Sequence, residues 1–577
     1  MHRPIVHRPV PAEALQGTDL HPLLRRIFAA RGITTPDELN YQLVALAEPQ
    51  RLKGIDSAAR YLLDAIENGQ RILIVGDFDA DGATSTAVAM LGLGMLGARH
   101  LDYRVPSRFS DGYGLLPGLV EALRDEGRLP DLLLTVDNGI VAHEGVQAAL
   151  EAGVEVVVTD HHLPGEDLPP ANAIVNPNQP GCEFAPSGMA GVGVIFYVLG
   201  ALRALQRESG WFRERQPSLA PLLDLVALGT VADVVPLDHN NRVLVQQGLR
   251  RIRAGHTRPG IRALLEVAGR DVNAVCASDL GFTLGPRLNA AGRLDDMSVG
   301  IECLLATEET RARRLARELD ALNRERRSIE TGMKAQAEEA VALLSLQPDG
   351  LPGILCLFDE NWHEGVIGLL ASRLKDRFHR PVIAFALDGD GDLKGSARSI
   401  PGLHMRDLLA ALDAREPGLL TRYGGHAMAA GMSLRHDQLE RFRSVLNNLI
   451  DERVDPGLFA PEVVTDGELE PQYMNLETAR LIAGAGPWGQ SFPEPLFSGD
   501  FGIAGQRILG EHHLKLQVRV PGLDSLVDAI AFNVDTDVWP SRGERARLVY
   551  HLDVNRYRGR ERLQFRVVYL EPLDNEG

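Results

Sequence analysis

Three clusters of acidic and histidine side chains each follow an apolar, β-branched run typical of a buried strand. The clusters are Asp77–Gly82 (Asp-Phe-Asp-Ala-Asp-Gly), Asp137–Gly139 (Asp-Asn-Gly) and Asp160–His162 (Asp-His-His). In an open parallel sheet ligands bind outside the carboxyl ends of the strands, so these side chains would converge on one pocket. Because an apolar core does not favour such side chains, a bound metal ion is the simplest agent that holds them together. The pattern therefore predicts a hydrolytic metal site.

The first cluster is the most specific of the three. Asp77, Asp79 and Asp81 place three carboxylates within five residues, where like charges repel one another. A divalent cation that prefers hard oxygen ligands, Mg²⁺ or Mn²⁺, makes the cluster favourable. An acidic turn is the alternative. A calcium loop of the EF-hand type is excluded, because the twelfth position from Asp77 is Val88 and not a glutamate.

Imidazoles and two further aspartates extend the candidate site. His161 and His162 shift the preference from Mg²⁺ toward Mn²⁺ or another transition metal. Their alternative is a pair of surface histidines after an N-cap formed by Asp160. Asp137 could equally belong to an ordinary Asp-Asn-Gly turn. Asp233 lies in an apolar stretch where an unpaired charge is costly, so it is either a ligand or a satisfied cap. The joint occurrence of the clusters favours the metal centre.

Length and composition indicate the class of protein in which this site lies. With 577 residues, 45% of them hydrophobic and 24% charged, the chain predicts an ordinary globular protein of about three to five units. The formal net charge of −18 argues against a protein coated in nucleic acid but allows a local basic groove. We expect no signal peptide and no membrane span, and hence a cytoplasmic protein. Reduced thiols are expected at four widely spaced cysteines, Cys182, Cys276, Cys303 and Cys356.

The elements that must position the clusters are readable from hydrophobic periodicity. Strands are expected near 71–76, 101–105, 131–136, 154–159 and 172–175, and helices near 83–97, 116–126 and 142–152. This alternation predicts a parallel sheet with helices on both faces. One long amphipathic helix is expected over 313–345, and alternating apolar residues in the last hundred positions predict a small β-barrel or sandwich.

These patterns divide the chain into five units. We expect an N-terminal helical segment at 1–60, a catalytic α/β domain at 61–240, a helical region with the long connecting helix at 241–345, a second α/β domain at 346–455 and a β domain at 460–577.

The clusters, together with the segment Gly229–Pro236 around Asp233, resemble the DHH phosphoesterase superfamily. Further matching segments are Gly285–Arg293, Trp362–Gly368, Ala371–Leu374, Gly424–Gly431 and Gly486–Gln490. From about residue 50 to the end, the chain resembles the RecJ family of bacterial 5′→3′ exonucleases specific for single-stranded DNA. The resemblance implies a DHH and a DHHA1-like α/β domain joined by the long helix, followed by an OB-like β-barrel.

The resemblance also implies roles for the clustered residues. Two divalent ions, Mn²⁺ or Mg²⁺, would be held by Asp79, Asp81, Asp137, His161 and Asp233, with Asp137 as the bridge. Asp77, Asp160 and His162 would complete the catalytic set, and His162 could stabilise charge on a phosphoryl oxygen. Small-molecule relatives carry a histidine shortly before the paired aspartates. The matching stretch here, Ile74–Asp77, contains none, so Asp77 is the candidate replacement.

Arginines, glycines and one hairpin are the candidates for holding a substrate. Arg108 follows the second strand on the same rim. Arg287 and Arg293, which flank Asn289, suit a 5′-phosphate pocket, with salt bridges to the acidic core as the alternative. The resemblance places further contacts at Ser372, Arg373, Ser396, Arg398, Gly424, Gly425 and His426. The hairpin containing Tyr557 and Arg558 interleaves an aromatic with arginines, as OB folds do when they hold single strands; a solvated basic tip is the alternative.

The sequence thus predicts a two-metal exonuclease that degrades single-stranded DNA 5′→3′ to 5′-mononucleotides in DNA repair and recombination. Expected partners are single-stranded DNA, a helicase and a single-strand-binding protein. One rival is a DHH phosphodiesterase for short oligoribonucleotides or cyclic dinucleotides. The other is a catalytically inactive DHH-fold scaffold that binds DNA, against which the intact set of predicted ligands speaks.

Overall fold

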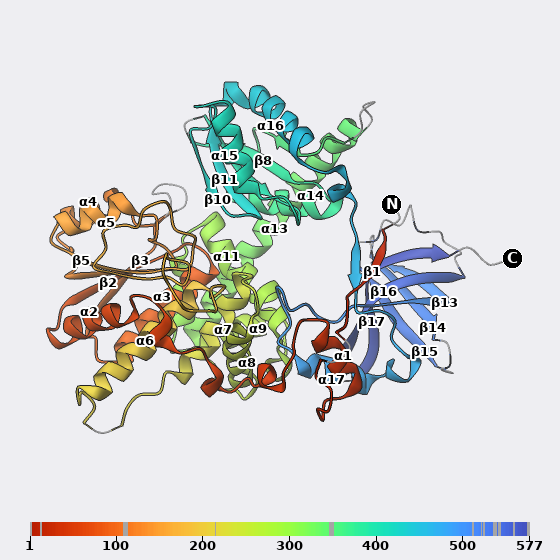
Figure 1. Ribbon diagram of the computed structural model, residues 1–577, viewed down its shortest axis with the longest axis horizontal. Helices are drawn as coiled ribbons and strands as arrows, with labels where there is room; N and C mark the ends of the chain where they lie inside the picture. Colours follow the sequence, from red (N-terminus) through yellow and green to blue (C-terminus); the bar gives the residue numbers. More distant parts are fainter. Residues whose placement is uncertain are drawn as a thin grey trace.

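The computed structural model describes most of the chain. The described residues are 3–11, 14–107, 114–213, 215–345, 351–389, 391–510, 513–520, 522, 525–532, 534, 539, 544–557 and 560–573. Two α/β domains and a β-barrel are arranged around a helical scaffold, with the second α/β domain above the first and the barrel to one side (Figure 1). None of the helices in these ranges combines the length and apolarity needed to cross a bilayer.

A parallel sheet of five strands forms the first α/β domain, in the order β3-β2-β4-β5-β6. The strands are β2 (Arg71–Gly76), β3 (His100–Arg104), β4 (Leu132–Val136), β5 (Glu155–Thr159) and β6 (Ala173–Val175). The helices α2 (Ile55–Glu67), α3 (Ala80–Met95) and α6 (Gly191–Glu208) cover one face, and α4 (Pro117–Asp125) and α5 (His143–Glu151) cover the other. Because both faces are buried, the central strands are continuous apolar runs. The predicted parallel sheet is confirmed.

The helix α3 begins three residues earlier than predicted, at Ala80 rather than near 83. Asp79 is its N-cap, and the Asp79 carboxylate accepts hydrogen bonds from the backbone N–H groups of Asp81 and Gly82. Such a cap satisfies amides that would otherwise have no partner. Asp79 and Asp81 therefore lie at the start of a helix, and Asp77 lies between β2 and that helix.

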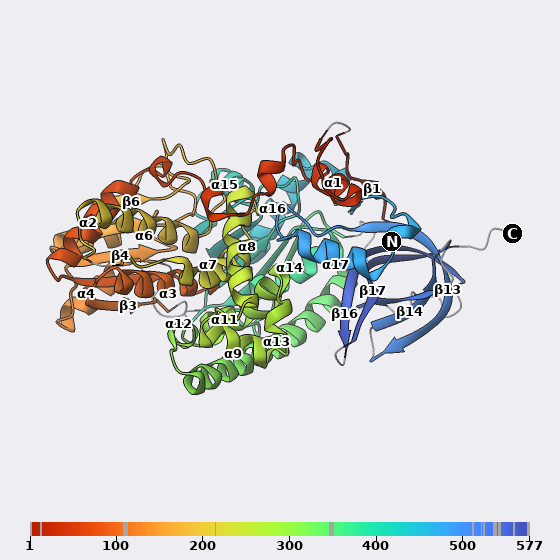
Figure 2. The ribbon, with the colours of Figure 1, turned by 90° about the horizontal axis from the view of Figure 1, so that it is seen from below.

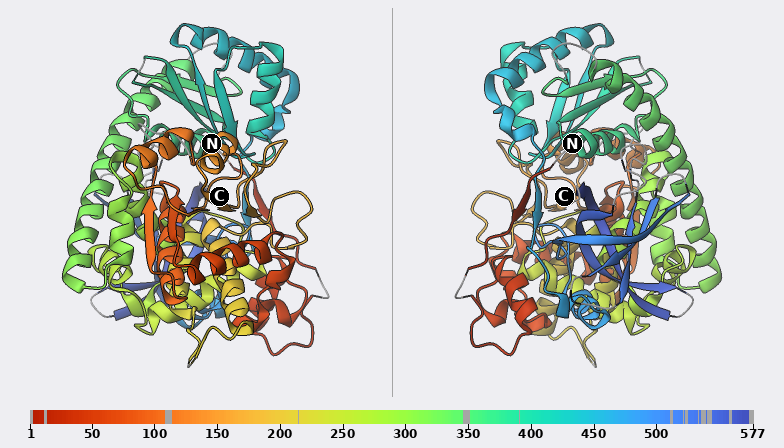
Figure 3. Two further views of the ribbon diagram at one scale, coloured as in Figure 1. Left: turned by 90° about the vertical axis from the view of Figure 1, so that its left-hand side faces the viewer. Right: turned by 90° about the vertical axis from the view of Figure 1, so that its right-hand side faces the viewer.

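A helical scaffold follows the first domain. It contains α7 (Leu223–Ala232), α8 (His239–Arg253), α9 (Pro259–Val267), α10 (Ala277–Asp279), the π-helix η6 (Leu280–Leu284), α11 (Gly285–Leu294), α12 (Ser298–Leu305) and α13 (Glu309–Ser345). The last of these has 37 residues, which corresponds to about 55 Å. Figure 3 shows α13 (green) running along one side of the molecule, from the other helices of the scaffold up to the second α/β domain. The predicted connecting helix is confirmed, four residues longer at its N-terminal end.

The second α/β domain has a mixed sheet in the order β10-β11-β9-β8-β7. Its strands are β7 (Leu355–Phe358), β8 (Val382–Leu387), β9 (Leu393–Arg398), β10 (Arg422–Gly425) and β11 (Ala429–Leu434), and its helices are α14 (Ile367–Phe378), α15 (Met405–Arg415) and α16 (Leu439–Arg453). The pair β7 and β8 is parallel, and the remaining neighbours are antiparallel. The strand β10 lies at the edge of the sheet.

The β domain is a closed barrel in the order β13-β14-β15-β17-β16. Its strands are β13 (Phe497–Leu509), β14 (His513–Arg519), β15 (Leu526–Ala531), β16 (Arg545–Tyr557) and β17 (Arg560–Leu573), and α17 (Leu476–Ala485) packs against it. Inside, Tyr550 stacks on Phe565 with ring centroids 4.2 Å apart, and Phe501 meets both rings. Of the two architectures predicted for this region, the barrel is the one observed.

The N-terminal segment is less helical than predicted. It contains α1 (Pro22–Ala29) but also the strand β1 (Ile5–His7), which pairs in parallel with β12 (Val463–Thr465). A three-residue strand carries little periodicity, and its partner lies far along the chain, so local pattern could not reveal it. The remaining short helices are η1 (Pro36–Leu39), η2 (Leu43–Ala45), η3 (Pro49–Arg51), η4 (Ala220–Leu222), η5 (Val272–Ala274), η7 (His436–Gln438), η8 (Pro456–Phe459) and η9 (Pro471–Tyr473).

Candidate metal centre

The carboxyl ends of β2, β4 and β5 bring the predicted clusters together beside the end of α7. The possible ligand atoms form three groups, and within each group all the atoms lie within 4.8 Å of one another. The groups are Asp77, Asp79 and Asp137; Asp81, His161 and Asp233; and Asp137, His161 and His162. All five predicted metal ligands are therefore gathered in one place, together with Asp77 and His162. Asp137 and His161 each belong to two of the groups, and of these two side chains only the carboxylate has two oxygens with which to bridge a pair of ions.

His161 lies at the middle of the cluster. Its Nε2 is 3.1 Å from Asp137 Oδ1, 3.5 Å from Asp233 Oδ2 and 4.0 Å from Asp81 Oδ2. Both His161 Nε2 and Asp137 Oδ1 are buried without a hydrogen-bond partner. Buried polar atoms in proteins are almost always satisfied, so these two atoms fit a site built for a cation. The set of carboxylates and one imidazole suits Mn²⁺ or Mg²⁺.

Backbone geometry holds the carboxylates in place. Asp137 has a left-handed backbone (φ 62°), a conformation that aspartate tolerates better than most residues. Asp81 accepts hydrogen bonds from the N–H groups of Gly191 (2.7 Å) and Val192 (3.1 Å) at the start of α6, where the helix dipole favours negative charge. A Cβ atom at Gly191 would lie 2.5 Å from Asp137 Oδ1, so glycine is required there. Gly191 is not among the residues predicted from the sequence; its signal is the small-residue run that opens α6.

Crowding of buried carboxylates changes their protonation. Burial and the charge of Asp233 raise the pKa of Asp81 to about 7, and burial and the charge of Asp79 raise the pKa of Asp233 to about 8. Burial and the charge of Asp81 also hold the pKa of Asp137 well above its usual value. A divalent cation reverses this penalty because it supplies the missing positive charge. Burial lowers the pKa of His161, which favours the neutral imidazole that binds metals.

Asp160 and His162 form a separate pair beside the cluster. Asp160 Oδ1 accepts hydrogen bonds from His162 Nδ1 and from the His161 N–H, each at 2.7 Å, and Asp160 Oδ2 accepts one from the Ile140 N–H at 2.9 Å. Burial acts to raise the pKa of Asp160, but the hydrogen bond and charge of His162 outweigh it and lower that pKa to about 2. Burial acts likewise to lower the pKa of His162, and Asp160 outweighs it and raises the pKa to about 10. The pair is therefore a carboxylate that orients an imidazolium. No helix begins at this point, so the N-cap alternative is wrong.

The second α/β domain faces the cluster through His426. Its ring stacks on His162, with centroids 5.8 Å apart and planes at 25°. His426 follows β10 and Gly425, whose φ of +134° is favourable only for glycine. In the register of the sheet, Gly424 lies opposite Gly431, which in turn lies opposite Ser396. Two predicted contacts, Gly424 and Gly425, thus lie on the strand that leads to His426, and a third, Ser396, lies two strands away across β11.

Two arginines near this sheet differ in their surroundings. Arg398, at the end of β9, donates to Ser396 Oγ at 3.1 Å. Arg373 follows Ser372 on α14 and donates to Glu330 on α13 at 2.9 Å. Arg398 therefore belongs to the group of predicted contacts beside His426, whereas Arg373 braces the domain against the connecting helix.

Arg287 is placed differently from the prediction. Its side chain is buried, with Nε and Nη2 3.0 and 2.9 Å from Asp320 and with Nη1 donating to the Thr283 carbonyl at 2.6 Å. These contacts favour the ion-pair alternative and do not support a 5′-phosphate pocket at Arg287. The prediction did not include Asp320 because this residue lies on α13, which packs against α11 only in the folded chain. Local sequence does not show that contact.

The neighbours of Arg287 on α11 also make hydrogen bonds within the protein, and their role as substrate contacts stays a prediction. Asn289 Oδ1 accepts a hydrogen bond from the Ala80 N–H at 2.7 Å, which fixes the acidic turn. Arg293 Nη1 donates to the Gly365 carbonyl of the second domain at 3.0 Å. The predicted contacts Arg108 and Arg558 and the side chain of Tyr557 lie outside the described residues.

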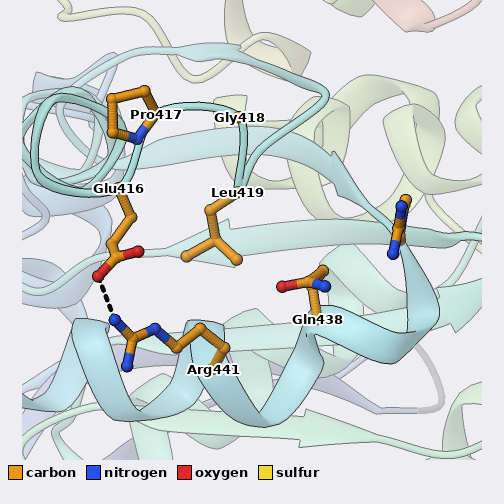
Figure 4. A pocket seen from close by; sticks show the side chains of 7 residues that line it. Glu416, Pro417, Gly418, Leu419, Gln438 and Arg441 are labelled. Atoms are coloured by element: carbon orange, nitrogen blue, oxygen red, sulfur yellow. Dashed lines mark hydrogen bonds and ion pairs between the residues drawn. The ribbon is translucent and has the colours of Figure 1, made fainter.

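A hollow of about 550 Å³ lies between the end of α15 and the start of α16. It is lined by Glu416, Pro417, Gly418, Leu419, Arg435, Gln438 and Arg441. Arg441 pairs with Glu416 (Figure 4), and Arg435 pairs with Asp437. Because its charges are compensated in this way, the hollow lacks the like-charge crowding of the metal cluster.

Comparison with known proteins identifies the family. The model of the DHH family N-terminal domain matches residues 71–230, that of the DHHA1 domain matches 351–452, and that of the RecJ OB domain matches 465–569. The single-stranded-DNA-specific exonuclease RecJ of Escherichia coli (strain K12) is 54% identical over 559 residues, covering 96% of each chain. This chain belongs to the RecJ family. The resemblance seen in the sequence is confirmed.

Other RecJ proteins are also similar to this chain in sequence or in structure. The RecJ of Haemophilus influenzae is 50% identical over 558 residues, covering 96% of this chain and 97% of its own. The crystal structure of RecJ from Thermus thermophilus in complex with Mn²⁺ matches with a TM-score of 0.80 at 30% identity, over 99% of this chain and 80% of that one. The Mg²⁺ complex of the same protein matches with a TM-score of 0.75. The predicted cofactors, Mn²⁺ or Mg²⁺, are the ions found in these relatives.

Proposed function

We propose that this chain is a metal-dependent exonuclease that hydrolyses single-stranded DNA from its 5′ end to 5′-mononucleotides. The observation that carries the proposal is the buried pair Asp137 Oδ1 and His161 Nε2. These atoms lie 3.1 Å apart without a hydrogen bond, inside a cluster of carboxylates, in a chain that belongs to a family of nucleases named for single-stranded DNA. The reaction, cofactors and substrate follow from these two facts together.

The metal ligands would be Asp79, Asp81, Asp137, His161 and Asp233, with Asp77 at the edge of the first site. Two divalent ions held there would supply Lewis-acid chemistry, lowering the pKa of an attacking water and neutralising charge on the phosphodiester. The protein itself keeps these oxygens in place through the N–H groups at the start of α6 and α3. Such preorganisation avoids reorganisation during the reaction.

His162 would bind the phosphate beside the metals. Asp160 occupies its Nδ1, and a pKa near 10 keeps the imidazolium charged at neutral pH. Its Nε2 is then a cationic donor suited to a phosphoryl oxygen. His426, which stacks on the His162 ring, would position both the imidazolium and the incoming strand from the second domain, together with Ser396, Arg398, Gly424 and Gly425.

The biological setting forms part of the proposal. A nuclease of this kind would act in the cytoplasm during DNA repair and recombination, on strands opened by a helicase and covered by a single-strand-binding protein.

Digestion of a single strand labelled at its 5′ end tests the proposal. With Mn²⁺ the wild-type protein should release labelled mononucleotide, and Asp81→Ala and His161→Ala should not. The same sequence as a duplex and a diribonucleotide serve as competing substrates. Absence of metal-dependent mononucleotide release would overturn the proposal, and equal action on the diribonucleotide would replace it with the small-substrate phosphodiesterase.

A further inference from the structure

One large aromatic side chain on the helical scaffold is exposed beside the metal centre. Phe282 has 80% of its surface exposed, whereas Leu280, Thr283 and Leu284 in the same π-helix are buried. A phenylalanine left in water forfeits the favourable free energy that its burial would contribute. Its exposure therefore contributes nothing to the core of this scaffold.

The π-helix η6, which leads directly into α11, packs against α7, the helix that the predicted ligand Asp233 follows. Figure 2 shows α7 next to α11. A Cβ atom at Gly281 would lie 3.0 Å from Val231 Cγ1, and one at Gly285 would lie 3.2 Å from Ala232 Cβ. Phe282 thus lies on the element that borders the α7 side of the metal centre. Val234, directly after Asp233, is also unusually exposed for an apolar residue, at 63%, and has a left-handed backbone.

Phe282 begins a line of residues that runs past the metal centre. The helical stretch from 282 to 293 has four exposed or half-buried residues, which are Phe282, Pro286, Asn289 and Arg293. They are four, three and four positions apart, and the remaining residues of the stretch are buried. Such spacing puts them on one helix face. Asn289 bonds the acidic turn at Ala80, and Arg293 bonds the second domain at Gly365. The distance from Phe282 to Asn289 along the helix is roughly 10 Å, the length of about three stacked nucleotides.

We propose that Phe282, flanked by Val234, is a base-stacking platform that positions one nucleotide of single-stranded DNA along this face while the scissile phosphate lies at the metal cluster. The inference rests on the proposed function. Every base has an apolar π-face, so an aromatic platform accepts any sequence, as a nuclease that degrades a strand base by base requires. The helix face that carries Phe282 continues to the acidic turn at Asn289 and to the second domain at Arg293. Because this face is long and narrow, we take an extended single strand as its occupant.

Substitution of Phe282 tests the platform. Phe282→Ala should raise KM for single-stranded DNA about 5- to 150-fold, with a smaller change in kcat, and Phe282→Trp should restore the wild-type value. Phe282→Leu, which is apolar but lacks the ring, should recover little. Val44→Ala removes an equally exposed apolar side chain (83%) from η2 in the N-terminal segment and should change nothing.

Substrates with a single abasic site identify the stacked nucleotide. When the abasic site is scanned along a fluorescent oligonucleotide, binding should weaken at one position in a hydrolysis-deficient Asp137→Asn background. In Asp137→Asn/Phe282→Ala that position should show no further loss. An unchanged position dependence, or equal KM for Phe282→Ala and wild type, would overturn the platform. Absence of hydrolysis by the wild-type protein would instead overturn the proposed function, because the binding scan does not require hydrolysis.

Discussion

The two domain edges that face each other across the active site are built on opposite principles. At the first domain the ends of buried parallel strands present Asp81 and Asp137, each only 1% exposed, and backbone N–H groups fix Asp81. At the second domain the edge strand β10 leaves Arg422, Tyr423 and Gly424 exposed. If the second edge binds the substrate as we propose, the contrast teaches that the chemistry lies where backbone N–H groups fix the carboxylates, and substrate binding lies where a chain can approach backbone and side chains from solvent.

The same contrast extends to charge. The first edge concentrates carboxylates whose pKa values are raised by burial and mutual repulsion, an arrangement that costs stability until a cation binds. Several charged groups in the second domain are paired instead, as Lys394 with Glu364 and Arg373 with Glu330 on α13 show. Only the first edge should therefore respond strongly to metal, which gives four tests of the comparison.

The largest effect is expected at Asp137. Asp137→Asn tolerates the left-handed backbone but removes the bridging carboxylate, so the rate of hydrolysis should fall on the order of 10³-fold, several kcal/mol of transition-state stabilisation. The affinity for single-stranded DNA should persist, because the second edge is intact. Single-turnover kinetics and fluorescence anisotropy measure the two quantities. If the variant kept its activity, Asp137 would not be the bridge.

The scaffold that separates the two edges depends on Arg287. Arg287→Ala leaves the buried Asp320 with only the solvent-exposed Arg324 as a partner, which should destabilise the protein by about 3 kcal/mol; denaturant unfolding measures this. The double variant Arg287→Met/Asp320→Leu should recover much of the loss. Preference for a 5′-phosphorylated end should stay at the wild-type level in a folded variant. A selective loss of that preference would restore Arg287 to the substrate site.

A smaller effect is expected at the second edge. His426→Ala removes the ring stacked on His162 and should lower kcat/KM about 10- to 100-fold, while calorimetric Mn²⁺ affinity stays unchanged. His100→Ala is the control, since His100 is exposed at the opposite end of the sheet, at the start of β3. Loss of Mn²⁺ binding in His426→Ala would contradict the claim that the metal ions are held by the first domain alone.

The smallest expected effect is a pH dependence of the first edge. The pKa values of Asp81 and Asp233 are raised in the folded state to about 7 and 8, so the folded protein without metal binds more protons than the unfolded chain. This contribution to stability is complete below pH 4 and is lost as pH rises through 7 to 8. The metal-free protein should therefore lose on the order of 1 kcal/mol per pH unit between pH 6 and 9, while stabilisation by Mn²⁺ grows. Thermal unfolding with and without Mn²⁺ measures both.

Asp81→Asn should flatten this dependence on pH. A metal-free stability that rises over the same range would show that the carboxylates are not crowded as described.

The parts of the site that the sequence predicted share one property. Asp77, Asp137 and His161 each follow a strand in the chain, so strand periodicity alone places them at one edge. Arg287 and Asp320 illustrate the opposite case, because their contact depends on how α11 packs on α13, which no local pattern encodes. Gly191 was missed for a related reason, since its role is to leave room for Asp137.

The fold shows the same division. The parallel sheet and the connecting helix have strong periodicity over many residues and were predicted within a few positions. The strand β1 depends on a distant partner, β12, and the choice between barrel and sandwich depends on closure between β13 and β16. Both are properties of pairing, so they appear only in three dimensions.

The central claim is that the strand ends of the first domain hold the metals and the second domain does not. Crystals grown with Mn²⁺ and measured at the manganese absorption edge test it most directly. We expect two anomalous peaks among Asp79, Asp81, Asp137, His161 and Asp233, and none at Ser396, Arg398 or His426. A peak ligated by the second domain, or no peak beside Asp137, would contradict this account.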